Sequence, residues 1–304
     1  ETGGVELAQE LYTEGYDRIR AAYPDAAAAD AAARCPDRAK ELGVGPEEVA
    51  AWRDAAEAIF IPYDEDLSVH PQAEEFTELA VWDFTSTGPD QYPLLLHFHY
   101  FDLYRKQVVK QADLVLALYL RGDAFSAEEK RRDFDYYEAL TVRDSSLSAF
   151  VQAVVAAEVG HLELAYDYFG EAAMLDLDDI YHNTRDGVHL ASLAGAWIAA
   201  VAGFGGMREH EGSLSFAPRL PRQLSRLDFG LLFRGRRIQV AIDHRQACYT
   251  LLQGASLDVT HHGTPVTLVP DEPVTRPIPK PAAPGPPPAQ PPGRAPARRL
   301  SAHG

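Results

Sequence analysis

The chain is poor in cysteine and in basic residues, and each shortage argues against a class of protein. Its 304 residues include only Cys35 and Cys248, which lie far apart, so neither a disulfide framework nor a thiolate metal site is expected. Lys and Arg number 28 against 45 Asp and Glu, which gives a net charge of -17. Proteins that bind nucleic-acid backbones nonspecifically need clustered cations. The acidic balance therefore argues against a nucleic-acid partner.

Long uncharged runs are also scarce. The longest stretch without Asp, Glu, Lys or Arg is Gly187–Met207, which is long enough to be considered as a membrane span. It holds five glycines together with His189 and Ser192, whereas a lipid-facing segment is richer in Leu, Ile and Phe. The acidic segment Glu1–Glu10 has no apolar core, so no signal peptide is visible. We therefore expect a buried helix, no membrane partner and a cytoplasmic location. Because residue 1 is Glu rather than Met, we interpret the chain as a fragment or a processed product.

Apolar residues recur at helical spacing through the first two thirds of the chain. Between the first two helices, residues 61–100 carry four prolines and are expected to form a long irregular connection, a kind of segment that is usually functional. The predicted helices are residues 46–60, Tyr104–Leu120, a segment opened by the capping box Ser126–Glu129, one from Leu147 to Gly160, Leu162–Ala173 and Leu190–Phe204.

After Arg208 the pattern changes to short strands separated by glycine turns. The predicted strands are Ser213–Phe216, Asp228–Phe233, Arg237–Ile242, Ala247–Leu252, Leu257–Thr260 and Pro265–Val269. Half of the 22 prolines lie between Pro273 and Pro296, in a composition typical of extended or disordered chain. We therefore predict a helical domain over residues 1–207, a small antiparallel β domain over 208–272 and a disordered Pro-rich tail over 273–304.

Two groups of polar residues near predicted helix starts could bind a sugar and an anion. Lys110 and Gln111 can both hydrogen-bond sugar hydroxyls, although Lys110 could instead belong to a solvated helix face with Lys106. The second group offers hydroxyls, free N–H groups at helix N-termini, a close backbone approach and an imidazole. Alternatively, the two serines of this group cap a helix N-terminus and its histidine packs in the core. The members of this second group are Ser145, Ser146, Gly187 and His189.

Taken together, these motifs resemble glycoside hydrolase family 65 from about Pro36 to Ile278. That family contains the maltose, trehalose and kojibiose phosphorylases. The resemblance implies a mainly α fold with a small all-β domain: a partial (α/α)6 toroid followed by an antiparallel β-sandwich-like domain. Gly203–Gly206 matches the junction between the two. Because the chain has room for only about half of the toroid, one apolar side would be left exposed.

The resemblance also implies an enzyme that inverts configuration. Phosphate would attack an α-glucosidic disaccharide of the maltose, trehalose or kojibiose type to release β-glucose 1-phosphate. The expected partners are the disaccharide and inorganic phosphate as co-substrate, without a cofactor and with a homodimer left open. No metal is expected, because the histidine pairs 97/99 and 261/262 lack further ligands. Lys110 and Gln111 would bind the substrate, and the phosphate would be bound by Ser145, Ser146, Gly187 and His189.

One part of the family pattern has no match. The family's general acid is a Glu in an Asp–Glu–Tyr motif, and Glu6, Glu10 and Glu14 stand in different surroundings. No catalytic residue is therefore assigned, residues 1–25 are expected to be unrelated sequence, and the chain alone is expected to have little phosphorolytic activity. The alternatives are a family hydrolase, a non-catalytic carbohydrate- or phosphate-binding remnant, and an interaction module that uses its Pro-rich tail.

Overall fold

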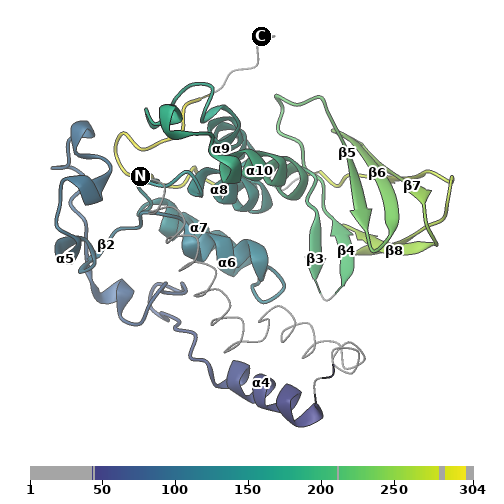
Figure 1. Ribbon diagram of the computed structural model, residues 1–304, viewed down its shortest axis with the longest axis horizontal. Helices are drawn as coiled ribbons and strands as arrows, with labels where there is room; N and C mark the ends of the chain where they lie inside the picture. Colours follow the sequence, from purple (N-terminus) through teal and green to yellow (C-terminus); the bar gives the residue numbers. More distant parts are fainter. Residues whose placement is uncertain (1–42, 44, 211, 281–284, 299–304) are drawn as a thin grey trace, which may run out of the picture. The chain divides into compact units, whose positions relative to one another are not determined.

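The computed structural model describes residues 43, 45–210, 212–280 and 285–298 (Figure 1). Its contacts divide the chain into two units, Glu1–Ile61 and Pro62–Gly304. In the first unit the described residues form helix α4, Pro46–Ala58. Proline stands in its first turn, where a missing N–H costs nothing, and Glu47 and Glu48 lie near its positive end. The helix predicted over residues 46–60 is confirmed.

The segment that follows is irregular, as predicted, but it carries short elements. The strands β1 and β2 form a two-residue parallel pair, and Gln107 in β2 donates its side-chain amide to the carbonyl of Thr77 at 2.9 Å. The elements are 3₁₀ turns at Phe76–Glu78, Pro89–Gln91 and Leu94–Leu96, helix α5 (Tyr100–Leu103), and strands β1 (Ala80–Val81) and β2 (Lys106–Gln107).

The predicted helix Tyr104–Leu120 is wrong in its first half. Only Asp113–Leu120 is helical, as α6, and the preceding residues form β2 and a bend. The reason is a tertiary pairing: Val109 donates its N–H to Leu140 O at 2.9 Å and accepts from Val142 N at 2.9 Å. Such pairing suits a β-branched residue and overrides the apolar spacing that suggested a helix.

Helix α8 is the centre of the helical layer, which follows the predicted pattern. Almost every residue of α8 is buried, and it contacts α6, α9 and α10, of which the last two lie beside it in Figure 1. The predicted capping box is confirmed, because Ser126 Oγ accepts from Glu129 N at 3.2 Å. The helices are α6, α7 (Ala127–Glu138), α8 (Ser148–Glu158), α9 (Leu162–Met174) and α10 (Leu190–Ile198), which continues as a π-helix over Ala199–Phe204.

The uncharged run Gly187–Met207 supplies α10 and this π-helix. No helix in the described part of the chain is long and apolar enough to cross a membrane. The expectation of a buried helix holds for the π-helix, whose Val201 and Phe204 are buried. It is wrong for much of α10, where Leu190 and Trp197 are 75% and 50% exposed.

The remaining strands form two four-stranded sheets, ordered β10-β7-β6-β5 and β3-β4-β8-β9. All the predicted strands are present, while β3 and β10 were not predicted, and β4 pairs with β8 in parallel. Apolar residues of both sheets share one core cluster with the helical layer, among them Phe216, Phe229 and Tyr249. The strands are β3 (Arg208–His210), β4 (Ser213–Phe216), β5 (Arg226–Phe233), β6 (Arg236–Asp243), β7 (Gln246–Gln253), β8 (Leu257–His261), β9 (Thr264–Leu268) and β10 (Val274–Pro277).

The prediction of a disordered tail over 273–304 needs a correction for its described residues. Strand β10 extends a sheet by pairing with β7. Further along, residues 285–298, which we call the C-terminal arm, contact the helical layer: Gln290 donates to Glu138, and Arg294 pairs with Asp144. A Pro-rich composition specifies extended backbone without internal hydrogen bonds. It does not reveal whether the side chains fix that backbone to a neighbouring surface.

Candidate functional site

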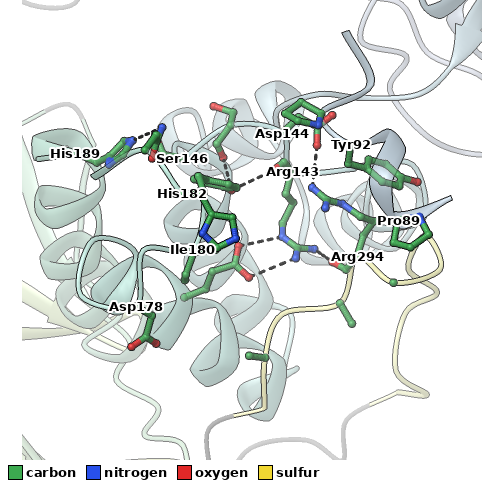
Figure 2. Close-up of a pocket in the computed structure, with 18 of the residues that line it drawn as sticks. Pro89, Tyr92, Arg143, Asp144, Ser146, Asp178, Ile180, His182, His189 and Arg294 are labelled. Atoms are coloured by element: carbon green, nitrogen blue, oxygen red, sulfur yellow. Dashed lines mark hydrogen bonds and ion pairs between the residues drawn. The ribbon is translucent and has the colours of Figure 1, made fainter. Parts of the chain in front are cut away.

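A cavity of about 880 Å³ opens in the second unit, and segments far apart in the sequence line it (Figure 2). Tyr92 and Leu96 come from the irregular segment, and Arg143–Ser146 from the loop before α8. The connection between α9 and α10 contributes Ile180–Asn183 and His189, and the C-terminal arm contributes Gly293 and Arg294, among others. Loops at the helix ends therefore form the walls, which leaves backbone N–H groups and polar side chains available to a ligand.

Ser145 and Ser146 lie just before α8, and Ser145 is held by two contacts. Its Oγ accepts from Leu147 N at 3.3 Å and donates to Gln111 Oε1 at 2.8 Å. The amide of Gln111 is oriented in turn by donating to Asp113 Oδ1 at 2.7 Å, at the start of α6. The structure thus brings together one residue of the predicted sugar group and one of the predicted anion group.

His189 precedes α10 and is fixed by a carboxylate. Its Nδ1 lies 2.6 Å from Asp176 Oδ1, and its backbone N–H donates to Asp176 Oδ2 at 2.9 Å. The hydrogen bond from His189 is the main cause that lowers the pKa of Asp176, so this carboxylate stays ionised. The other ring nitrogen, Nε2, lies 3.3 Å from Asn183 Nδ2. The carboxylate sets the ring orientation: in the neutral ring Nδ1–H donates to Asp176, so Nε2 accepts the hydrogen bond from the Asn183 amide.

Three of the predicted site residues, Lys110, Gln111 and Gly187, are not among the residues that line the cavity. Lys110 is exposed, and its charge only partly offsets the burial that raises the pKa of Asp144. Gly187 has φ +130°, and its N–H donates to Thr184 O at 3.1 Å. This backbone conformation favours glycine, so the residue shapes the approach to His189 without lining the cavity itself.

Several polar residues that line the cavity are not among the predicted site residues. Arg143 forms an ion pair with Glu171, with Nε–Oε1 and Nη2–Oε2 distances of 3.2 and 3.3 Å. Burial raises the pKa of Asp144, whose side chain is only 4% exposed and which pairs with Arg294 at 2.8 Å. Asp144 directly precedes the serine pair, which is a signal that the sequence offered; nothing comparable pointed to Glu171 or Arg294.

The cavity therefore offers hydroxyls, one oriented imidazole and two guanidinium groups that already have carboxylate partners. A small oxyanion would find donors in the Ser146 hydroxyl and in the side-chain amide of Asn183, both of which line the cavity. In the part of the chain that the structure describes, no cluster of three or more His, Cys, Asp or Glu could hold a metal ion. These groups can hydrogen-bond a small polar or anionic ligand.

Known proteins are similar to this chain in sequence and in fold. The chain is 52% identical over 90% of its length to an uncharacterised glycosyl hydrolase of Mycobacterium leprae (strain TN), of which it covers 35%. It is 44% identical to an α,α-trehalose phosphorylase of Geobacillus stearothermophilus, over 77% of this chain and 31% of that protein. A solved structure named "Putative kojibiose phosphorylase from human microbiome" matches with a TM-score of 0.68 and 27% identity, over 79% of this chain and 33% of the other. The chain thus spans about a third of the length of these relatives.

Two family descriptions together match most of the chain. The glycosyl hydrolase family 65 central catalytic domain matches residues 2–198, and the C-terminal domain of the same family matches residues 207–268. The first match corrects our expectation that residues 1–25 are unrelated sequence and that the resemblance begins near Pro36. The predicted fold class, part of a helical toroid followed by a β domain, is confirmed. The chain belongs to glycosyl hydrolase family 65.

Proposed function

We propose that this chain supplies the phosphate-binding part of the catalytic domain of a disaccharide phosphorylase. The observation that carries the proposal is the convergence of Ser145, Ser146 and His189 on one cavity. The serines and the histidine come from different loops. Asp176 orients the histidine, because its Oδ1 lies 2.6 Å from His189 Nδ1. If the serines only capped a helix and the histidine only packed in the core, we would not expect them to line the same cavity. Anion binding explains why they do, because both loops lead into helix N-termini.

The proposed reaction is phosphorolysis with inversion, in which phosphate attacks the anomeric carbon and an acid protonates the leaving oxygen. Phosphate is already a charged nucleophile, so this half of the site needs donors rather than a base. We propose α,α-trehalose as the first disaccharide to test, because a trehalose phosphorylase is 44% identical to the chain. No acid is assigned here, so the contribution of this chain is to bind and orient the phosphate. A homodimer and a cytoplasmic location stay predictions.

Phosphate binding tests the proposal directly. We expect the chain to bind inorganic phosphate with a dissociation constant in the millimolar range, about -4 kcal/mol. His189→Ala and Ser145→Ala should each weaken binding several-fold, because each removes a polar side chain that lines the cavity. Phosphorus NMR or calorimetry measures the constants.

The matched controls are His244→Ala and Ser256→Ala, which change exposed residues in turns of the β part. They should bind phosphate as the unchanged chain does. If all five proteins bind phosphate equally, the ion sits elsewhere and the proposal fails. It fails equally if the unchanged chain shows no binding at 50 times the expected constant, roughly 50 mM phosphate.

A further inference from the structure

A turn shapes the C-terminal arm where it reaches the cavity. Arg294 N donates to Pro291 O at 3.0 Å, and Gly293 between them has φ +72°, a conformation that favours glycine. Pro291 and Pro296, on either side of the turn, are buried. Between these two prolines, Gly293, Arg294 and Ala295 line the cavity. This part of the arm is therefore a wall of the cavity.

Gln290 anchors the arm to the helical layer just before the turn. Its Nε2 donates to Glu138 Oε1 at 2.6 Å and lies 3.0 Å from Tyr168 Oη. Glu138 is 1% exposed and also accepts from Gln152 Nε2 at 2.8 Å. Burial raises the pKa of Glu138, so a buried carboxyl group that needs donors receives one of them from the arm.

Arg294 contacts the loop before α8 through both its side chain and its backbone (Figure 2). Its Nη2 donates to Asp144 Oδ1 at 2.8 Å and its Nε to Val142 O at 2.6 Å. The guanidinium lies 4.4 Å from the centre of the Tyr92 ring. The carbonyl of Arg294 accepts a hydrogen bond from Arg143. Side chain and backbone of this one residue thus contact Val142, Arg143 and Asp144 in succession.

The buried charge of Asp144 is balanced by its ion pair with Arg294. The second oxygen of its buried carboxylate accepts from Leu94 N at 2.7 Å. Among the described residues Arg294 is the cation in contact with it, while Lys110 and Arg143 act at longer range. A buried carboxylate that loses its cation is unfavourable and must move or take up a proton. Because Asp144 is bonded to Ser145, its movement would displace the serine pair.

We propose that Arg294 is a positioning residue: through Asp144 it holds Ser145 and Ser146 in place for phosphate, and the C-terminal arm is an integral part of the phosphate site. The inference rests on the proposed function above. Two of the three guanidinium nitrogens of Arg294, Nε and Nη2, are engaged by Val142 O and Asp144 Oδ1, so we assign its role to the contact with Asp144. The conservative change Arg294→Lys keeps the charge but loses the planar fork that reaches Asp144 and Val142 together.

The experiment compares Arg294→Met, Arg294→Lys and the control Arg298→Met in the full chain. Arg298 is exposed and lies on the same arm, so the control removes the same charge without touching Asp144. We expect Arg294→Met to weaken phosphate binding by about tenfold, as for loss of a hydrogen bond to a charged group, and Arg294→Lys by about threefold. Arg298→Met should bind as the unchanged chain does. NMR of the chain labelled with ¹⁵N-serine gives a second readout, the positions of the Ser145 and Ser146 amides without phosphate.

The two readouts separate failure of this inference from failure of the proposed function. If the unchanged chain binds phosphate and Arg294→Met binds it equally well, the arm does not position the site and the inference is wrong. If no protein binds phosphate, the proposed function is wrong. In that case the NMR signals of the Ser145 and Ser146 amides test whether Arg294 positions the serines. Shifted signals in Arg294→Met but not in Arg298→Met support the inference, and unshifted signals in Arg294→Met overturn it. Where Arg294→Met does not fold, Arg294→Lys decides, and full affinity in that variant overturns the inference.

Discussion

At the scale of single residues, buried His261 shows how one ring connects two sheets. Its Nε2 lies 3.0 Å from Pro277 O in β10, and its Nδ1 lies 2.7 Å from Tyr249 Oη in β7, while His261 itself belongs to β8. A carbonyl can only accept, so Nε2 carries the hydrogen and Nδ1 accepts from the tyrosine. Burial lowers the pKa of His261, which favours this neutral form of the ring.

This arrangement predicts that acid destabilises the chain. The pKa of His261 in the folded chain lies below the ordinary value of 6.5, so below that pH the unfolded chain binds more protons. Burial also lowers the pKa of the neighbouring His262, which acts in the same direction. Each such histidine adds at most about 1.4 kcal/mol per pH unit to the slope of stability against pH. We expect the thermal midpoint to fall from pH 7.5 to 5.5, less steeply in His261→Gln.

Circular dichroism at several pH values measures this slope. The control is His244→Gln, which alters an exposed histidine in the turn between β6 and β7. It should follow the unchanged chain. Parallel slopes for all three proteins would show that His261 does not titrate differently in the folded and unfolded states.

The residue types of the candidate site could be predicted from sequence, but their partners could not. Short motifs identified the serine pair and His189 because hydroxyls and an imidazole before helices suit an anion. The partner of His189 is Asp176, 13 positions earlier, and the partner of Asp144 is Arg294, 150 positions later. Many carboxylates and cations in the chain could have filled either role. Only the packing of the loops decides which of them do.

At the scale of elements, two glycines link the π-helix to β3. Gly206 has φ +61°, and its carbonyl accepts from Ala217 N at 3.0 Å. A Cβ at Gly206 would overlap the backbone carbonyl of Ala217. The predicted junction at Gly203–Gly206 thus has a physical basis, because the chain can turn here only without a side chain.

We therefore expect Gly206→Ala to destabilise the chain by more than about 2 kcal/mol. The left-handed conformation alone costs an alanine about 1–2 kcal/mol, and the overlap with backbone adds to it. Gly263→Ala is the matched control, since Gly263 has φ +77° with open space where its Cβ would lie. Urea denaturation compares the two, and equal losses would contradict the role given to the close approach.

Periodicity predicted the elements well where each element packs one face on a core. The strands from β4 to β9 and the helices α7 and α9 follow that rule, and the glycine and serine residues at their ends indicated most of the boundaries. Tyr104–Leu120 broke the rule because the backbone of Val109 pairs with the chain near Leu140 and Val142. β3 and β10 are short, and their pairing partners, not their own patterns, make them strands.

At the scale of the whole molecule, α10 carries an uncovered apolar stripe. Leu190, Leu193 and Trp197 follow one face of the helix and are 75%, 44% and 50% exposed. This exposure fits the expectation that about half a toroid leaves an apolar side open. A contiguous apolar stripe promotes association in water.

We expect the purified chain to associate as its concentration rises. Leu190→Ser combined with Leu193→Ser should reduce that association, because it removes apolar area from the stripe. Leu232→Ser, which changes an 80% exposed leucine in β5, should not. Light scattering coupled to gel filtration measures the mass of each protein. A monomer at all concentrations, or equal association of both variants, would contradict the prediction.

The C-terminal arm resembles a peptide ligand carried by its own receptor. It docks through the side chains of Gln290 and Arg294, about 150 positions from the residues that they contact. What keeps such a ligand bound is its effective concentration, which the connecting chain sets and which falls only slowly with connection length. A single peptide-bond cut between β10 and the arm would remove that advantage and leave every contact chemically intact. Occupancy of the cavity wall would then depend on dilution, as it does for two separate molecules.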